Sequence, residues 1–315
     1  MIQNKKNLIT VFIVIFITFL LIYTKIPQFF NPINLISNVF VPGAISTLIA
    51  LGMMVVMTGG GVDLSIGTIA GLSALVGVSI TIISNNVILG IFFALFAGAI
   101  IGLFNGLLIG GMGLSPFVVT LGTTFVAGGL QYIVSSRVDI GGMGGTYLIL
   151  PGSMEFLSSD LNIFLIFVGS CSIIFILFEK LTYGRQIKSV GENPIASRLS
   201  GVKTRYIAGS TYIISGVLAA IVGLLLASLQ GVVRVGLGND YLMDAFINPL
   251  LGMVIFGRFS ILGVIVSAVV ITAVLNICII LGMNLTLIQI TKGVVLLGII
   301  FIRGIQLQRQ RRKFL

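Results

Sequence analysis

Ten long runs of apolar residues make up most of this chain and restrict its fold more than any other feature. They are Leu8–Tyr23, Leu35–Met57, Leu64–Ile83, Val87–Ile109, Phe117–Val134, Ile163–Phe178, Ile207–Leu229, Leu242–Ile255, Ile261–Leu281 and Leu287–Ile302. A helix needs about 20 apolar residues to cross a bilayer. Only 8% of the residues are charged, whereas soluble domains average about 25%. The pattern predicts an all-α polytopic membrane protein with about ten transmembrane helices in one domain, residues 1–315, and excludes a water-soluble globular enzyme.

The basic residues gather at the two ends of the chain and in one long connecting loop. They include Lys5, Lys6, Lys180, Arg185, Lys188, Arg198, Lys203, Arg205, Arg303, Arg309, Arg311, Arg312 and Lys313. Cytoplasmic loops of membrane proteins carry an excess of Lys and Arg. We therefore expect both termini and the loop 179–205 to be cytoplasmic, with six helices before this loop and four after it. The net charge of +10 then reflects topology and not a nucleic-acid partner.

The chain lacks the residues that most enzymes use for catalysis. It has no His and no Walker A, GxSxG or HExxH signature. Cys171 and Cys278 lie inside apolar runs, where cysteines more often pack as small apolar side chains than form a metal site or a disulfide. We predict no catalytic residue, no metal and no cofactor in this chain, so any ATP hydrolysis that drives transport belongs to another chain.

A helix break is predicted between the second and third apolar runs. Gly59, Gly60 and Gly61 follow Thr58, and Asp63 and Ser65 then begin the next helix. Acidic and hydroxyl side chains cap the free N–H groups of a helix N-terminus. Two interpretations stay open. The segment is either a cap at a tight reversal or a discontinuous helix that lines a pathway, because irregular backbone at membrane depth is tolerated around a cavity.

The basic loop carries the pattern of a short capped helix. Asn193 stands at a helix N-cap position, Pro194 at the first helical position and Gly201 just past the expected end. One interpretation is a short amphipathic helix on the cytoplasmic side that docks a partner. The other is a plain basic loop that obeys the charge bias, and the spacing alone does not separate the two.

Isolated polar side chains inside the apolar runs are candidates to line a solute pathway. They are Thr58, Asn105, Thr120, Thr123, Thr124, Gln131, Asn248, Asn276 and Gln289. For any single one of them, a hydrogen bond between helices is the commoner role.

Lys292 differs from these candidates because an ionisable residue within a membrane helix is by default a functional hypothesis. Asp63 and Asp244 are its candidate partners, and snorkelling of the lysine to the interface is the alternative.

Four segments taken together resemble a known family. They are Gly60–Gly67 (GGVDLSIG), Ser115–Thr123 (SPFVVTLGT), Tyr183–Val202 (with YGR, ENP and LSGV) and Gln289–Val295 (QITKGVV). Jointly they resemble motifs of the permease subunits of ribose-type ABC sugar importers, over residues 35–302. The resemblance implies a vitamin-B12-importer-like (type II) ABC permease fold in a bacterial inner membrane. It also implies uptake of a monosaccharide or similar polyol-like solute by alternating access.

The resemblance also implies partners. These are cytoplasmic ATPase subunits that bind ATP and Mg, a second permease subunit of the same or a different kind, and an extracytoplasmic sugar-binding protein. Coupling to the ATPase is expected at Arg185, Glu192, Asn193, Pro194, Arg198, Leu199 and Gly201. The expected translocation pathway comprises Thr58, Asp63, Ser65, Asn105, Thr120, Thr123, Asn248, Asn276, Gln289 and Lys292.

One region departs from the family pattern. Between Gly238 and Gly263 the paired glycines of the family are missing, and Asn248 and Pro249 enter an expected helix. Proline removes a backbone hydrogen bond, so this helix is expected to break or kink. Such drift suits a permease that works beside a second, different permease subunit.

Three alternatives are weighed against the sugar importer. The first keeps the importer but exchanges the cargo for a nucleoside or a furanone-like signalling molecule. The second is an ion-coupled secondary transporter, which is weakened because the chain has no His and only Asp63 and Asp244 as intramembrane relay candidates. The third is an accessory membrane subunit.

Overall fold

The computed structural model describes residues 26–137 and 147–311. The expected helix Leu8–Tyr23 and its flanking lysines lie outside the described residues. The first half comprises η1 (Pro27–Phe30), α2 (Pro32–Asn34), η2 (Leu35–Phe40), α3 (Val41–Thr58), α4 (Ile66–Ser84), α5 (Val87–Gly106), η3 (Leu107–Gly111), α6 (Pro116–Arg137), β1 (Tyr147–Ile149) and η4 (Gly152–Ser158). The second half comprises α7 (Asp160–Phe175), η5 (Ile176–Lys180), α8 (Thr182–Glu192), α9 (Pro194–Leu199), α10 (Thr204–Gln230), β2 (Val232–Arg234), η6 (Asn239–Tyr241), α11 (Leu242–Phe256), α12 (Ile261–Ile280) and α13 (Leu285–Arg311).

Seven helical segments in the described part are long and apolar enough to cross a membrane, by length and composition. They correspond to the expected runs from Leu35–Met57 to Ile207–Leu229, and to Ile261–Leu281. Two further expected helices are shorter, because α11 has 15 residues and the apolar part of α13 is Thr286–Phe301. The polytopic helical fold is therefore confirmed, whereas the total of about ten helices stays a prediction.

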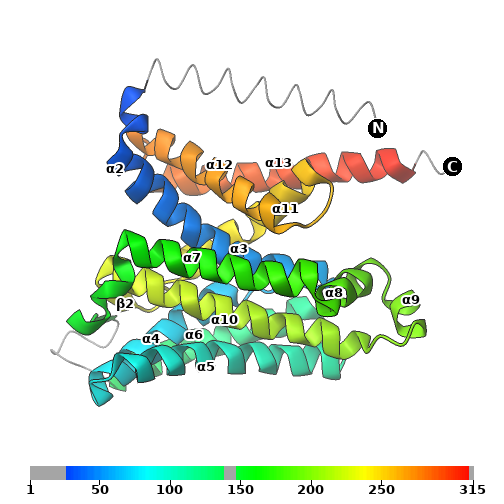
Figure 1. The fold of residues 1–315 in the computed structure, drawn as a ribbon, viewed down its shortest axis with the longest axis horizontal. Helices are drawn as coiled ribbons and strands as arrows, with labels where there is room; N and C mark the ends of the chain where they lie inside the picture. Colours follow the sequence, from blue (N-terminus) through cyan, green and yellow to red (C-terminus); the bar gives the residue numbers. More distant parts are fainter. Residues whose placement is uncertain (1–25, 138–146, 312–315) are drawn as a thin grey trace.

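The core is built on α3, α4 and α10, whose membrane-length windows are mostly buried inside the protein. Figure 1 shows α7 and α10 crossing the middle of the molecule, α4 to α6 on one side of them and α11 to α13 on the other. Glycines bring α5 and α10 into backbone contact, because a Cβ added at Gly98 would lie 2.3 Å from the carbonyl oxygen of Gly216. Small residues of this kind let membrane helices approach closely.

Two details differ from the sequence prediction. The all-α class holds apart from two three-residue strands, β1 and β2, which pair antiparallel with Leu148 opposite Val233. These strands pair the backbone groups of two segments that lie outside the predicted apolar runs.

The second difference is that α11 runs unbroken from Leu242 to Phe256 through Pro249, so a helix break at this proline is wrong, whereas a kink stays a prediction. Pro249 is buried among neighbouring helices, and such surroundings let a membrane helix tolerate proline because other groups satisfy the freed backbone.

Candidate functional site

The short capped helix that the sequence predicts is present as α9. The side-chain Oδ1 of Asn193 accepts a hydrogen bond from the backbone N–H of Ala196 at 3.0 Å, and Pro194 is the first helical residue. Gly201 has a φ of +83°, a left-handed conformation that glycine adopts without strain. These three residues therefore fix where α9 begins and how the chain leaves it.

The surface of α9 is unusual because large apolar side chains point away from the protein. Ile195 is 74% exposed and Leu199 is 85% exposed. Glu192 and Arg198 are also exposed, and within the described residues neither forms an ion pair. Arg185, on the preceding α8, donates a hydrogen bond to Thr182 Oγ1 at 3.0 Å. An exposed apolar pair flanked by free charges suits a surface that another protein covers.

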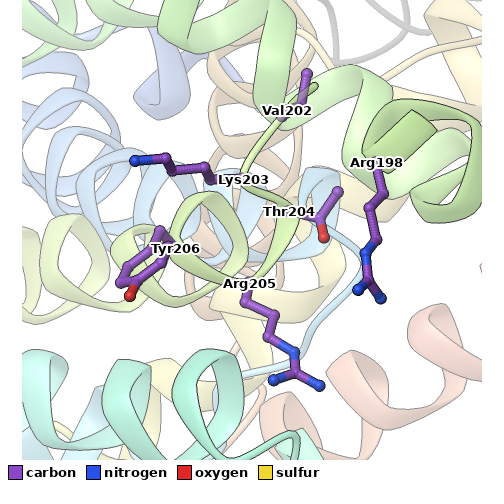
Figure 2. A pocket seen from close by; sticks show the side chains of 6 residues that line it. All are labelled: Arg198, Val202, Lys203, Thr204, Arg205 and Tyr206. Atoms are coloured by element: carbon purple, nitrogen blue, oxygen red, sulfur yellow. The ribbon is translucent and has the colours of Figure 1, made fainter. Parts of the chain in front are cut away.

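A basic pocket of about 320 Å³ lies beside α9, where α10 begins. Figure 2 shows Arg198 and Arg205 extending to the same side, near Thr204, while Lys203 and Tyr206 lie on the other side. The first turn of α10 has no acidic residue and no side-chain cap, so its free N–H groups add to the positive potential. Sequence reasoning used Lys203 and Arg205 for topology and missed them, with Tyr206, as surface residues of this site.

The amphipathic helix α8 connects the exposed surface of α9 to the helix break that follows Thr58. Gly191, one residue before the end of α8, lies against Thr58 and Gly60, and a Cβ added to it would stand 1.8 Å from the Thr58 carbonyl oxygen. Gly60 itself has a φ of +87°. The two glycine-rich motifs, about 130 residues apart in the sequence, are thus in direct backbone contact, which neither motif predicts alone.

Asp63 is the centre of a buried polar network just after the helix break. Its Oδ1 accepts hydrogen bonds from the backbone N–H and the hydroxyl of Ser65, at 3.0 and 2.6 Å. Its Oδ2 accepts one from the hydroxyl of Ser215 on α10 at 2.7 Å. Asp63 has no exposed surface, so these three donors replace the water that an ionised carboxylate needs.

The network continues through two further helices. Asn105 on α5 donates to Ser65 Oγ at 3.0 Å, and Thr123 on α6 donates to Asn105 Oδ1 at 2.5 Å. The hydrogen bonds therefore run in one direction, with Thr123 donating to Asn105, Asn105 to Ser65 and Ser65 to the Asp63 carboxylate. The network joins the start of α4 to α5, α6 and α10, which supports interhelical hydrogen bonding by Asp63, Ser65, Asn105 and Thr123, whereas no side-chain hydrogen bond caps the N-terminus of α4. Ser215 was missed because a lone serine in an apolar run carries no distinctive signal.

Lys292 pairs with Asp244 and not with Asp63. Its Nζ lies 2.8 Å from Asp244 Oδ1, and the two side chains are 11% and 7% exposed. One turn further along α11, Asn248 donates a hydrogen bond to Ser46 of α3 at 2.8 Å. Two of the expected pathway residues, Asn248 and Lys292, therefore lie in a polar seam between α3, α11 and α13, which we call the α11 seam.

The remaining pathway candidates do not join either cluster. Asn276 exchanges side-chain hydrogen bonds with Asn34 at 2.9 and 3.2 Å. Thr58, Thr120 and Thr124 bond to carbonyl groups of their own helices, Gln131 bonds to Thr68 and Gly236, and Gln289 is exposed. The ten expected pathway residues therefore do not line one cavity in this chain alone.

The chain matches known transport proteins along most of its length. Residues 35–302 match the family described as branched-chain amino acid transport system / permease component. The chain is 30% identical to the ribose import permease protein of Bacillus subtilis (strain 168), over 95% of this chain and 92% of that protein. It is 27% identical to the galactose/methyl galactoside import permease protein of Escherichia coli (strain K12), over 98% and 99% of the two chains.

A further relative is the autoinducer 2 import system permease protein of Yersinia pseudotuberculosis serotype O:3 (strain YPIII). The identity is 28%, over 84% of this chain and 76% of that protein. No solved structure matches the chain significantly.

Proposed function

Because the chain belongs to the family of transport-system permease components, we propose that it is the membrane subunit of an ABC importer for a monosaccharide or similar polyol-like solute. The family description names branched-chain amino acids, but the relatives that match nearly the whole chain are ribose and galactose/methyl galactoside permeases. Their coverage supports a sugar as cargo. The Yersinia relative supports a furanone-like signalling molecule as the second candidate.

The contact between Gly191 and the Thr58–Gly60 segment carries the proposed mechanism. An ATPase subunit that binds ATP and Mg docks on α9, where Ile195 and Leu199 are exposed. Movement of α9 passes to α8, and the Gly191 backbone pushes on the helix break. The Asp63 network then moves α4, α5, α6 and α10 together, because one chain of hydrogen bonds joins them.

The polar side chains of the two clusters supply the proposed pathway. Sugar hydroxyls both donate and accept hydrogen bonds, so they can exchange with amide and hydroxyl partners such as Asn105, Thr123 and Asn248 as the helices separate. A second permease subunit completes the pathway, and an extracytoplasmic sugar-binding protein delivers the solute. The proposal places the chain in the inner membrane with both termini cytoplasmic, and with about ten helices in a vitamin-B12-importer-like arrangement.

Co-purification and uptake test the proposal. The tagged chain should carry an ATPase subunit with it, and a ligand screen on the cognate binding protein should yield a sugar. Exchanging Glu192 or Arg198 for Ala should uncouple ATP hydrolysis from uptake while solute delivery stays intact. Uptake that persists without any ATPase subunit would refute the importer, and coupling that persists in both variants would refute the assignment of α9.

A further inference from the structure

A groove of about 950 Å³ runs between α7–η5 and the α11–α12 segment, away from the two polar clusters. Most of its wall is apolar and consists of side chains such as Val168, Phe175, Leu262 and Ile265. Leu262 is 66% exposed and Phe175 is 45% exposed, so no other part of the described chain covers this surface. Its volume is in the range of about 300–1,000 Å³ that small-molecule sites occupy.

One end of the groove is charged, with Glu179, Lys180 and Arg258. Glu179 is engaged elsewhere, because its Oε2 lies 2.9 Å from Lys188 Nζ. Lys180 stays at the groove, with its Nζ 5.6 Å from the centre of the Phe175 ring. Arg258 is exposed and forms no ion pair within residues 26–137 and 147–311. Lys180 and Arg258 therefore lie at one end of the apolar groove, without an acidic partner among the described residues.

We propose that this groove binds an anionic phospholipid of the cytoplasmic leaflet. An acyl chain lies along Val168, Phe175 and Leu262, and the headgroup phosphate contacts Lys180 and Arg258. Basic pockets between membrane helices on the cytoplasmic side suit anionic headgroups. The charge at this end fits the cytoplasmic placement of Lys180 and Arg258 expected from the distribution of basic residues. The lipid bridges α7 to the α11–α12 pair.

Charge favours a lipid over the other candidate occupant, the N-terminal apolar run of the same chain. That run follows Lys5 and Lys6, so its cytoplasmic end would bring further positive charge to Lys180 and Arg258. Like charges at close range repel each other. A phosphate group instead offers both cations an anionic acceptor.

Tryptophan fluorescence offers a direct test, because the chain contains no Trp. Phe175→Trp places a single reporter in the groove, and the full-length chain is reconstituted in phosphatidylcholine vesicles. Brominated phosphatidylglycerol or brominated phosphatidylcholine is then added as the quencher. Phosphatidylglycerol should reach half-maximal quenching at a mole fraction on the order of tenfold lower than phosphatidylcholine, given the contribution of each nearby cation.

Three further variants identify the source of any preference. Phe104→Trp reports from the exposed surface of α5, where the two lipids should quench equally. In the Phe175→Trp background, Lys180→Gln with Arg258→Gln should abolish the preference, whereas Lys203→Gln with Arg205→Gln, the same loss of charge outside the groove, should retain it.

Three outcomes of the preference measurement would overturn the proposal. The first is equal quenching by the two lipids at Phe175→Trp. The second is a preference for phosphatidylglycerol that survives removal of Lys180 and Arg258. The third is that the control variant at Lys203 and Arg205 loses this preference as fully as the variant at Lys180 and Arg258. Absence of quenching by either lipid would mean that protein fills the groove, which also overturns it. Size-exclusion chromatography of each variant checks that loss of quenching does not come from misfolding.

Discussion

The buried pair of Lys292 and Asp244 yields the sharpest prediction. With 2.8 Å between Nζ and Oδ1, Coulomb attraction is about 6 kcal/mol at an effective dielectric constant of about 20. Desolvation of the two groups cancels much of that attraction. Removing one partner is different, because it leaves an uncompensated buried charge. Lys292→Met should therefore lower the free energy of unfolding by about 3–5 kcal/mol.

A double-mutant cycle tests the reasoning. Asp244→Asn combined with Lys292→Met removes both charges, so the double variant should recover most of the loss caused by Lys292→Met alone. Unfolding in mixed micelles with increasing denaturing detergent measures each variant. The loss in Lys292→Met should also shrink at acidic pH, because a protonated Asp244 carboxyl carries no charge to leave unpaired.

The opposite pattern would refute this account. If Lys292→Met is as stable as the parent chain at every pH, the lysine snorkels to the interface in the membrane and the pair contributes nothing. If the double variant is as unstable as the single one, the defect comes from lost packing and not from an unpaired charge. Sugar uptake by the same variants separates a role in transport from a role in folding.

Three further predictions concern the other contacts. Gly191→Ala should lower the free energy of unfolding by about 1–3 kcal/mol and reduce ATPase-coupled uptake, because its Cβ would meet the Thr58 carbonyl oxygen. Gly169→Ala, which has open space around the added Cβ, is the control, and equal effects of the two substitutions would contradict the contact. Asn105→Ala should lower the free energy of unfolding in detergent by about 1–3 kcal/mol, since it removes the acceptor of the Thr123 hydroxyl and one donor to Ser65, and no loss would contradict the network. Leu199→Asp should leave the unfolding midpoint unchanged, because the side chain is 85% exposed, yet abolish co-purification of the ATPase subunit; normal co-purification would contradict docking on α9.

Much of the fold follows from local sequence. The apolar runs predict the positions of the long helices, because most of these runs approach or reach the length that a bilayer requires. The capped start of α9 is equally local, since Asn193, Pro194 and Gly201 act on backbone within a few residues of themselves. Four short motifs sufficed for the family resemblance, which the match over residues 35–302 confirms.

The candidate site was predicted only in part. Polar residues in apolar runs are visible in the sequence, but their partners are not, because hydropathy does not say which helix faces are in contact. Thr58 and Thr120 bond to their own helices, whereas Asn105 and Thr123 join a network. The same residue types in the same kind of run thus have different roles.

The sequence by itself determined that this protein is a helical membrane protein, because hydropathy is a local property, and its four motifs resembled a permease family, which the match over residues 35–302 confirms. Only the tertiary structure decided that Lys292 pairs with Asp244, that Gly191 abuts the helix break, and that α11 continues through Pro249. Each of these depends on how helices distant in the sequence pack against one another. In a bilayer, that packing is set by shape and by the few polar groups available, which the pattern along one helix does not reveal.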